Sequence, residues 1–307
     1  MTYDVIIIGN GPAGLAAGIY GKRAGLSTLL LSDSPMAGGQ ITSTYEVDNY
    51  PGLPRISGFD LGDKMKEHAD MLGVEYATGR VSEIVDNGAI KTLKTVDDGD
   101  FEAKTVIIAT GADHRKLLIP GEEEFTGMGV SYCATCDGAF FRNKTVAVVG
   151  GGDVALEDAI FLSRFASKVY LIHRRDEFRG AKVLQDQVKS IDKIEIVYDT
   201  VLDEIIGKDA VEKIVTTNKK TGEKKEIELN GVFMAVGIVP NVSNIKGLPA
   251  QDEGGYLVAG EDCVTSIPGI YAAGDVRTKQ LRQVITAASD GANAITSIEK
   301  YINETLS

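Results

Sequence analysis

Two glycine-rich segments, each between an apolar strand-like run and a helix-like run, constrain the fold of this chain most strongly. The first follows the run at residues 4–8 and reads Gly9, Asn10, Gly11, Pro12, Ala13, Gly14. The second follows residues 145–149 and reads Gly150, Gly151, Gly152, Asp153, Val154, Ala155. In this pattern the glycines allow a tight turn, close backbone approach to a pyrophosphate, and packing of helix on strand. We therefore predict an α/β protein with two Rossmann-like units that bind two nucleotides.

Length and charge limit the possible classes of protein. With 307 residues the chain can bury two separate cores. Its 44 acidic and 32 basic residues give a net charge of −12, the wrong sign for binding nucleic acid or an anionic membrane. No stretch approaches the roughly 18 apolar residues of a spanning helix, and the first ten residues lack a basic leader. We expect a soluble cytoplasmic protein.

A two-cysteine centre lies between the glycine-rich segments. Cys133 and Cys136 are spaced C-x-x-C, and Asp137 follows them directly. Such a pair can close into a small disulfide ring, and proximity lowers the pKa of one thiol so that a reactive thiolate exists near neutral pH. A carboxyl in a partly desolvated cleft can carry protons during dithiol–disulfide exchange. The hypothesis is a catalytic redox pair with Asp137 as proton carrier.

Two other interpretations of the cysteines are weaker. A zinc knuckle needs a second ligand pair, whereas the rest of the chain offers Cys263 and three scattered histidines, so we expect no metal site. A structural disulfide is disfavoured in a reducing cytosol. Cys263 itself is interpreted as a buried structural thiol, since free cysteine is often buried.

Several polar residues follow the first glycine-rich segment. Asp33 comes after a second apolar strand at residues 27–31 and is either a ribose ligand or a solvated loop residue. A long connection then carries Gly39, Gln40 and Asn49. The side-chain amides of Gln40 and Asn49 could form hydrogen bonds with a bound ring system, or with the backbone of the loop itself.

Two further segments are predicted to approach the same nucleotide. The apolar strand at residues 106–112 ends in the small residues Thr110 and Gly111, which lets it run close to a cofactor. Near the C-terminus a strand runs into Gly274 and Asp275, whose carboxylate can accept hydrogen bonds from a ribityl chain. Arg282 and Gln283 then lead into a long helix from Val284, whose positive end would face the N1/C2 edge of a flavin.

A basic cluster follows the second glycine-rich segment by about twenty residues. The strand at residues 168–172 ends in His173, Arg174 and Arg175, with Arg179 four residues beyond. An NAD site usually carries an acid at this offset, whereas arginines can pair with a 2′-phosphate. The cluster therefore favours NADPH, the alternative being a solvated basic turn.

Taken together, these motifs resemble the low-molecular-weight, bacterial-type thioredoxin reductases, which are FAD- and NADPH-dependent pyridine nucleotide-disulfide oxidoreductases. The resemblance covers essentially the full length. It is carried by residues 133–138, by Gly39 and Gln40 with residues 48–52, by residues 150–155 with the basic cluster, and by residues 273–275 with 282–284.

The resemblance implies a domain plan and a reaction. Residues 1–112 and 244–307 would form an FAD-binding domain, and residues 113–243 an inserted NADPH-binding domain that carries the disulfide. Electrons would pass from NADPH through FAD and the disulfide to oxidised thioredoxin, with Cys136 nearer the flavin. The middle domain would rotate between half-reactions about hinges near residues 112–115 and 240–243. The family is homodimeric.

The resemblance also assigns binding residues. For FAD they are Gly9, Gly11, Pro12, Ala13, Gly14, Asp33, Gly39, Gln40, Asn49, Thr110, Gly111, Gly274, Asp275, Arg282, Gln283 and Val284. For NADPH they are Gly150, Gly152, Asp153, Val154, Ala155, His173, Arg174, Arg175 and Arg179.

Two departures from the family pattern and several alternatives stay open at this point. Val154 stands where relatives often have a small hydroxyl residue, which removes one phosphate contact, and Gly180 replaces a common alanine with little expected effect. A sibling enzyme could draw electrons from ferredoxin or reduce another thiol carrier, and a redox sensor would have no turnover. The apolar residues 139–141 either help to dock the partner or pack in the core.

Overall fold

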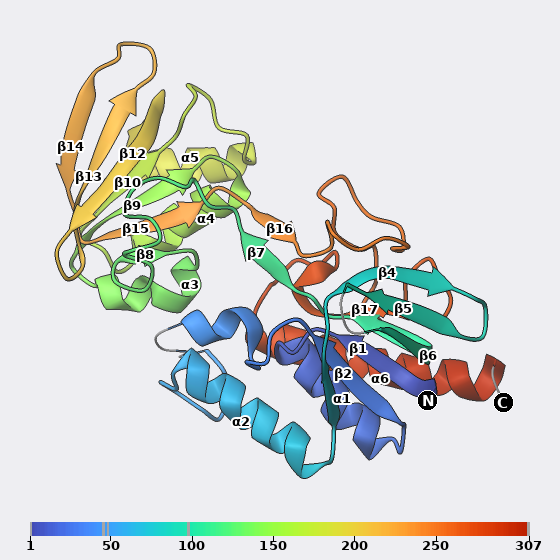
Figure 1. Cartoon of the computed structure of the whole chain (residues 1–307). Helices are drawn as coiled ribbons and strands as arrows, with labels where there is room; N and C mark the ends of the chain where they lie inside the picture. Colours follow the sequence, from blue (N-terminus) through green and yellow to red (C-terminus); the bar gives the residue numbers. More distant parts are fainter. Residues whose placement is uncertain (1, 45–46, 48, 97–98, 306–307) are drawn as a thin grey trace. The chain divides into compact units, whose positions relative to one another are not determined.

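The computed structural model describes residues 2–44, 47, 49–96 and 99–305. The chain divides into two compact units, the first formed by Met1–Asp113 with Val239–Ser307 and the second by His114–Ile238 (Figure 1). Strand β7 (Ala112–His114) pairs with β16 (Ile238–Pro240), and the chain passes between the units within these two strands.

The first unit is built on a sheet whose central strands are parallel. The order is β3-β2-β1-β6-β5-β4, with β17 also paired to β6. Strands β1, β2, β3, β6 and β17 run parallel, and β4 and β5 form an antiparallel hairpin that extends from β6. Their bounds are β1 Thr2–Ile8, β2 Thr28–Ser32, β3 Glu75–Thr78, β4 Val81–Asp86, β5 Lys91–Thr95, β6 Asp100–Ile108 and β17 Ile270–Ala272.

Both faces of this sheet are buried, as expected for a parallel sheet rich in β-branched residues. Alternate residues of β1 point to opposite sides, so Val5 and Ile7 belong to one apolar cluster and Ile6 and Ile8 to another. The first cluster includes residues of α1 and α6. The helical segments of this unit are α1 Pro12–Arg23, α2 Gly58–Met71 and α6 Val284–Thr305, with the short turns η1 Gly39–Ser43 and η3 Gly274–Val276.

The second unit repeats the design. Its parallel sheet has the order β11-β10-β9-β15-β8, and an antiparallel sheet has the order β12-β13-β14. The parallel strands are β8 Val130–Ser131, β9 Thr145–Gly150, β10 Lys168–Ile172, β11 Ile194–Val197 and β15 Gly231–Ala235. The remaining elements are β12 Thr200–Gly207, β13 Val211–Asn218, β14 Lys224–Glu228, α3 Ala134–Asp137, η2 Gly138–Phe141, α4 Asp153–Leu162 and α5 Lys182–Ser190.

The predicted α/β class with parallel sheets is confirmed, and one helix boundary differs. We call the two glycine-rich segments, residues 9–14 and 150–155, the first and second fingerprints. The sequence pattern extends the helix after the second fingerprint to about residue 167, whereas α4 ends at Leu162. Ser163 Oγ donates to the carbonyl of Ile160 at 2.7 Å, a local bond that competes with helix continuation. The run Asp97-Asp98-Gly99-Asp100 predicts a turn between two short strands, and its first two residues lie outside the described residues. Glu46 and Asp48, in the long connection that carries Asn49, also lie outside them. Among the helices described, none is long and apolar enough to cross a membrane.

Candidate functional site

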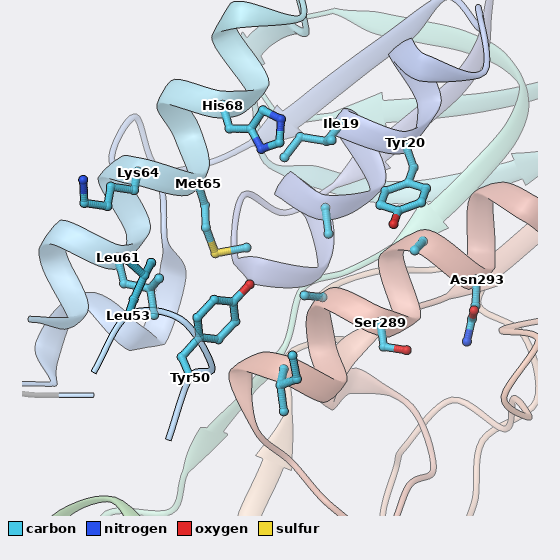
Figure 2. Close-up of a pocket in the computed structure, with 14 residues that line it drawn as sticks. Ile19, Tyr20, Tyr50, Leu53, Leu61, Lys64, Met65, His68, Ser289 and Asn293 are labelled. Atoms are coloured by element: carbon cyan, nitrogen blue, oxygen red, sulfur yellow. The ribbon is translucent and has the colours of Figure 1, made fainter. Parts of the chain in front are cut away.

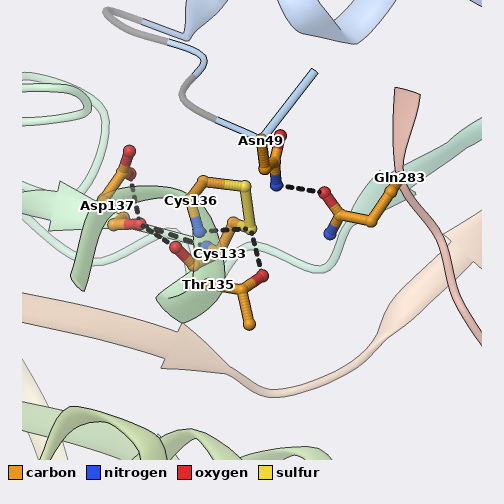
Figure 3. Close-up of a disulfide and its surroundings, with 7 residues drawn as sticks. Asn49, Cys133, Thr135, Cys136, Asp137 and Gln283 are labelled. Carbon is orange, nitrogen blue, oxygen red and sulfur yellow. Dashed lines mark hydrogen bonds between the residues drawn. A yellow bond between two sulfur atoms is a disulfide. The ribbon is translucent and has the colours of Figure 1, made fainter. Parts of the chain in front are cut away.

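The two cysteines of the C-x-x-C segment form a disulfide in the second unit (Figure 3). Their Cα atoms are 5.3 Å apart. Cys133 precedes the single turn of α3, and its Sγ accepts the Cys136 backbone N–H at 3.2 Å. The Cys133 Sγ also lies 3.4 Å from Thr135 Oγ1. The close pair that the sequence predicts is therefore present.

Asp137 lies half-buried beside this disulfide and is linked to it through Ser131. Ser131 Oγ donates to Asp137 Oδ2 at 2.6 Å and accepts the Cys133 backbone N–H at 3.1 Å. Burial raises the pKa of Asp137, and the Ser131 hydrogen bond opposes this only in part. A carboxyl tuned in this way can hold and release a proton closer to neutral pH. Sequence reasoning missed Ser131, because a serine two residues before a cysteine has no distinctive spacing.

The basic segment after β10 is tied back to the second fingerprint loop. Arg179 and Gly180 donate their backbone N–H groups to the Gly151 carbonyl at 2.8 and 3.3 Å. Asp153 Oδ1 accepts the Ala181 N–H at 2.6 Å. The fold therefore brings the predicted arginines next to the strand–helix turn, although they are more than twenty residues further along the chain.

The side chains of that segment divide into exposed and buried members. Arg174, Arg175 and Arg179 are exposed, and within the described ranges none of them forms an ion pair with an acid. His173 is buried, its Nε2 lies 3.0 Å from the Glu177 carbonyl oxygen, and burial lowers its pKa. A Cβ at Gly151 would lie only 2.2 Å from the His173 ring. The buried His173 ring thus packs against the loop at Gly151, while the guanidinium groups of the three arginines face solvent.

The two departures from the family pattern have different surroundings. Val154 is 61% exposed in the first turn of α4. Gly180 packs against the fingerprint, since an added Cβ would lie 2.5 Å from Leu156 Cδ1 and 3.1 Å from the Asp153 nitrogen. Leu156 is fully buried, so it has little room to move. We therefore expect a methyl group added at position 180 to press on Leu156 and on the start of α4.

The first fingerprint leaves one position open and packs the others closely. Gly9 has φ +111°, and a Cβ there would lie 2.4 Å from the Ala109 carbonyl oxygen. A Cβ at Gly14 would lie 1.9 Å from the Gly9 oxygen. At Gly11 the nearest atom to an added Cβ is 3.9 Å away, which leaves room for a phosphate at the start of α1.

Asn10, an unspecified position of the pattern, shapes the neighbouring loop. Its buried side chain donates to the carbonyls of Ser34 and Met36 at 2.8 and 3.0 Å. These bonds fix the segment after β2, where Asp33 is exposed beside the fingerprint strand. Sequence reasoning missed this role, because only the partner identities distinguish Asn10 from any other loop residue.

Two buried polar atoms lie just beyond the ends of the neighbouring parallel strands β6 and β17. Within the described residues, the buried side-chain atoms without a hydrogen-bond partner are Thr110 Oγ1 and Asp275 Oδ1. Burial raises the pKa of Asp275. Folded proteins rarely leave such atoms unpaired. An acceptor and a hydroxyl at this edge fit the polyhydroxyl chain of a dinucleotide, so the residues present suit FAD.

The remaining flavin-side residues come together from distant parts of the chain. Asn49 Nδ2 donates to Gln283 Oε1 at 2.9 Å across 234 positions (Figure 3). Gly39, with φ +58°, lies against Gly11, where a Cβ would be 3.2 Å from the Gly11 Cα. Gln40 is an exposed residue of η1.

Arg282 is held just before α6. Its Nε donates to the Asp275 carbonyl at 3.4 Å, and its guanidinium lies 4.2 Å from the centroid of the Tyr256 ring. Gln283 donates its N–H to Thr286 Oγ1, and α6 begins at Val284 as predicted. Tyr256 was not anticipated from the sequence, where it is one tyrosine among several in a loop.

Outside these sites, the first unit contains a pocket of about 740 Å³ between α1, α2 and α6 (Figure 2). Its lining is mostly apolar and includes Ile19, Tyr50, Met65 and Ile285. None of its lining residues belongs to the first fingerprint.

Cys263 is a buried thiol as predicted, and burial raises its pKa to about 12.

Two glycine-rich strand–helix turns and a disulfide beside a half-buried carboxyl are the features of a nucleotide-dependent disulfide oxidoreductase. The chain belongs to the pyridine nucleotide-disulphide oxidoreductase family, whose model matches residues 3–291. It is 47% identical over 305 residues to a thioredoxin reductase of Listeria innocua, covering 98% of this chain and 94% of that protein. It is 43% identical over 303 residues to a thioredoxin reductase of Bacillus subtilis, covering 98% and 95%.

Solved structures agree with the sequence relatives. The thioredoxin reductase of Streptococcus pyogenes has a TM-score of 0.93 and 46% identity, and the match covers 98% of both chains. The chain is therefore an α/β oxidoreductase of this family, similar to bacterial thioredoxin reductases over nearly its whole length.

Proposed function

We propose that this chain is an NADPH-dependent thioredoxin-disulfide reductase that passes electrons through FAD and the Cys133–Cys136 disulfide to oxidised thioredoxin. The observation that carries the proposal is the disulfide joined through Ser131 to a carboxyl of raised pKa. The similarity to thioredoxin reductases of Listeria innocua and Bacillus subtilis supports the choice of substrate.

In this proposal residues 1–112 and 244–307, which make up most of the first unit, hold FAD. The opening at Gly11 receives the pyrophosphate and Asp33 a ribose, while Thr110 and Asp275 pair with hydroxyl groups. The positive end of α6 faces the isoalloxazine ring. When bound, FAD supplies the two-electron relay between the nicotinamide and the disulfide.

Residues 113–243 bind NADPH in this proposal. The pyrophosphate lies at Gly152, where α4 begins, and an added Cβ at Gly152 would meet no atom within 4 Å. Arg174, Arg175 and Arg179 then pair with the 2′-phosphate. Their exposure beside the fingerprint, without acidic partners among the described residues, supports this assignment.

The chain's own residues perform the exchange with thioredoxin. One thiolate of the reduced pair attacks the substrate disulfide and forms a mixed disulfide. The second cysteine attacks that bond, which restores Cys133–Cys136 and releases the substrate with both electrons. Asp137 delivers a proton to a departing thiolate, and the second proton comes from the attacking thiols. By resemblance, we assign Cys136 to the flavin side.

Motion of the second unit is part of the proposal. The disulfide and the NADPH fingerprint both belong to His114–Ile238, whereas the FAD residues belong to the other unit. Both sites need the same flavin, so we propose that they alternate by rotation about hinges near residues 112–115 and 240–243.

Partner contacts complete the proposal. Phe141 is buried and packs edge-on against Phe233, with ring centroids 5.2 Å apart, so it belongs to the core. Phe140 is exposed and is our candidate for contact with thioredoxin. We also propose that the protein is cytoplasmic and that it is a homodimer. Sedimentation of the purified protein tests the oligomeric state.

Donor exchange tests the proposal against the ferredoxin-dependent alternative. Purified protein is assayed for thioredoxin reduction with NADPH, NADH or reduced ferredoxin, and with a glutaredoxin-like carrier in place of thioredoxin. Turnover that is fastest with NADPH and thioredoxin supports the proposal. Turnover with ferredoxin alone identifies the sibling enzyme, and absence of turnover with every pair identifies a redox sensor.

A further inference from the structure

A buried cluster of three charged residues lies in the first unit, and the proposed function does not use it. Asp290 of α6 accepts from Arg277 at 2.8 and 2.7 Å and from Lys279 at 2.9 Å. The three side chains are only 5%, 9% and 6% exposed, respectively. Burying charges is costly even when they are paired, so such a cluster calls for an explanation beyond stability.

The cluster carries more positive than negative charge. Burial alone would raise the pKa of Asp290, but the hydrogen bonds from Arg277 and Lys279 lower it below its usual range, so Asp290 is a carboxylate. One carboxylate therefore faces two cations. Arg277 also donates to the carbonyls of Ala259 and Thr278, which leaves Lys279 as the cation with fewer fixed partners in the described chain.

Asp290 is also bonded to the backbone of the flavin segment. Its Oδ2 accepts the Gly274 N–H at 2.9 Å. Gly274 has φ +81°, and a Cβ there would lie 2.9 Å from Ala13 Cβ of the first fingerprint. The cluster thus fixes a left-handed backbone position that favours glycine, comes directly before Asp275 and packs on the first glycine-rich segment.

Asp275 itself is surrounded by groups that act on its charge. Burial raises its pKa and so does the neighbouring Asp290, whereas Lys279 and Arg282 act in the opposite direction. Burial raises the pKa of Tyr256, and the Asp275 charge adds to this shift. Asp275 Oδ1 has no hydrogen-bond partner among the described residues.

We propose that the Asp290–Arg277–Lys279 cluster is a positioning device for FAD, in which Asp290 fixes the Gly274 backbone and Lys279 supplies a positive charge near Asp275, whose carboxylate accepts a flavin hydroxyl. The proposal deepens the proposed function, because it rests on FAD being the cofactor. Protonation of Asp275 weakens acceptance of a hydrogen bond. FAD affinity therefore falls at low pH, and Lys279 sets the pH at which the fall begins.

The test measures FAD release from the purified holoprotein on dilution, followed by flavin fluorescence between pH 5 and 8.5. In Lys279→Met, the pH below which FAD dissociates should move upward by about one unit, the usual effect of losing a neighbouring opposite charge. Lys279→Arg keeps the charge and should restore the wild-type profile. Lys300→Met removes an exposed lysine of α6 and is the matched control, with an unchanged profile.

The outcomes separate this inference from the proposed function. Lys279→Gln repeats the comparison with a side chain that still reaches Asp290, and thermal unfolding is measured for each variant. An unshifted profile in folded Lys279→Met and Lys279→Gln overturns the inference while leaving the reductase assignment intact. A wild-type protein that binds FAD with the expected shift, but does not reduce thioredoxin, overturns the function and leaves the inference standing. A wild-type protein without affinity for FAD contradicts both.

Discussion

The two fingerprint turns have the same backbone design, yet the residues after the next strand give them opposite electrostatic surroundings. In the first unit Asp33 follows β2, and beyond the ends of β6 and β17 the side-chain atoms Thr110 Oγ1 and Asp275 Oδ1 have no hydrogen-bond partner among the described residues. In the second unit exposed arginines follow β10, and the backbone N–H of Arg179 donates to the Gly151 carbonyl of the loop. In our proposal the glycine pattern provides a pyrophosphate site in each unit, and the neighbouring strand ends distinguish one nucleotide from the other.

The largest expected effect tests whether the disulfide exchange depends on the cysteine pair of the second unit. Cys136→Ser should reduce thioredoxin-dependent turnover to background, because the disulfide cannot form. FAD content and NADPH binding should stay at wild-type levels, since Cys136 contacts neither fingerprint through any described hydrogen bond. Turnover and flavin content are measured together. Residual thioredoxin reduction well above background would show that another group carries the electrons.

Asp137→Asn is expected to lower turnover with thioredoxin by about 10²-fold, the lower range for loss of a general acid or base. The pKa of Asp137 is raised, and its protonated form is the proton donor. The wild-type rate should therefore fall as pH rises through that pKa, and the variant should lack this falling limb of the pH–rate profile. Ser131→Ala removes the opposing hydrogen bond and should move the limb to higher pH. A variant profile with the wild-type limb would assign the proton to another group.

The double change Arg174→Ala with Arg175→Ala sharpens the contrast between the two turns. The KM for NADPH should rise roughly ten- to a hundredfold, since hydrogen bonds between charged groups contribute about 1.5–3 kcal/mol. The KM for NADH should change little, because NADH lacks the 2′-phosphate. Lys182→Ala, at an exposed lysine nearby, serves as the control. Equal losses with both nucleotides would mean that the arginines shape the loop rather than read the phosphate.

The smallest effect is expected for Gly180→Ala. The added methyl group meets Leu156 and the start of α4, and overpacking of this kind costs about 1–3 kcal/mol. Thermal unfolding should shift to lower temperature, and the KM for NADPH should rise severalfold as the arginine segment moves from the loop. An unchanged melting temperature would show that the Leu156 side chain shifts without loss of stability.

Sequence patterns predicted the parts of this molecule that depend on local spacing. The β1 and β9 strands, the turns that follow them, and the disulfide pair all lie where the sequence indicated. Each is encoded within a few consecutive residues by glycine freedom, apolar runs or cysteine spacing. The individual nucleotide contacts stay predictions that the variants above address.

The features missed are side-chain bonds between positions far apart in the chain. The hydrogen bond between Asn49 and Gln283 forms only after the sheet and α6 have packed. The same holds for the ion pairs of Asp290 with Arg277 and Lys279. No local periodicity distinguishes these residues from solvated loop residues. The close approach of Gly180 to Leu156 is hidden for the same reason, because Leu156 belongs to a different element.

The central claim is a single electron path through both units, and flavin absorbance tests it most directly. The yellow protein is mixed anaerobically with NADPH, and oxidised thioredoxin is then added. We predict bleaching on the first addition and recovery on the second, with Cys136→Ser bleaching but not recovering. Failure to bleach with NADPH, together with bleaching by reduced ferredoxin, would contradict the assignment of the arginine-flanked turn and with it the proposed donor.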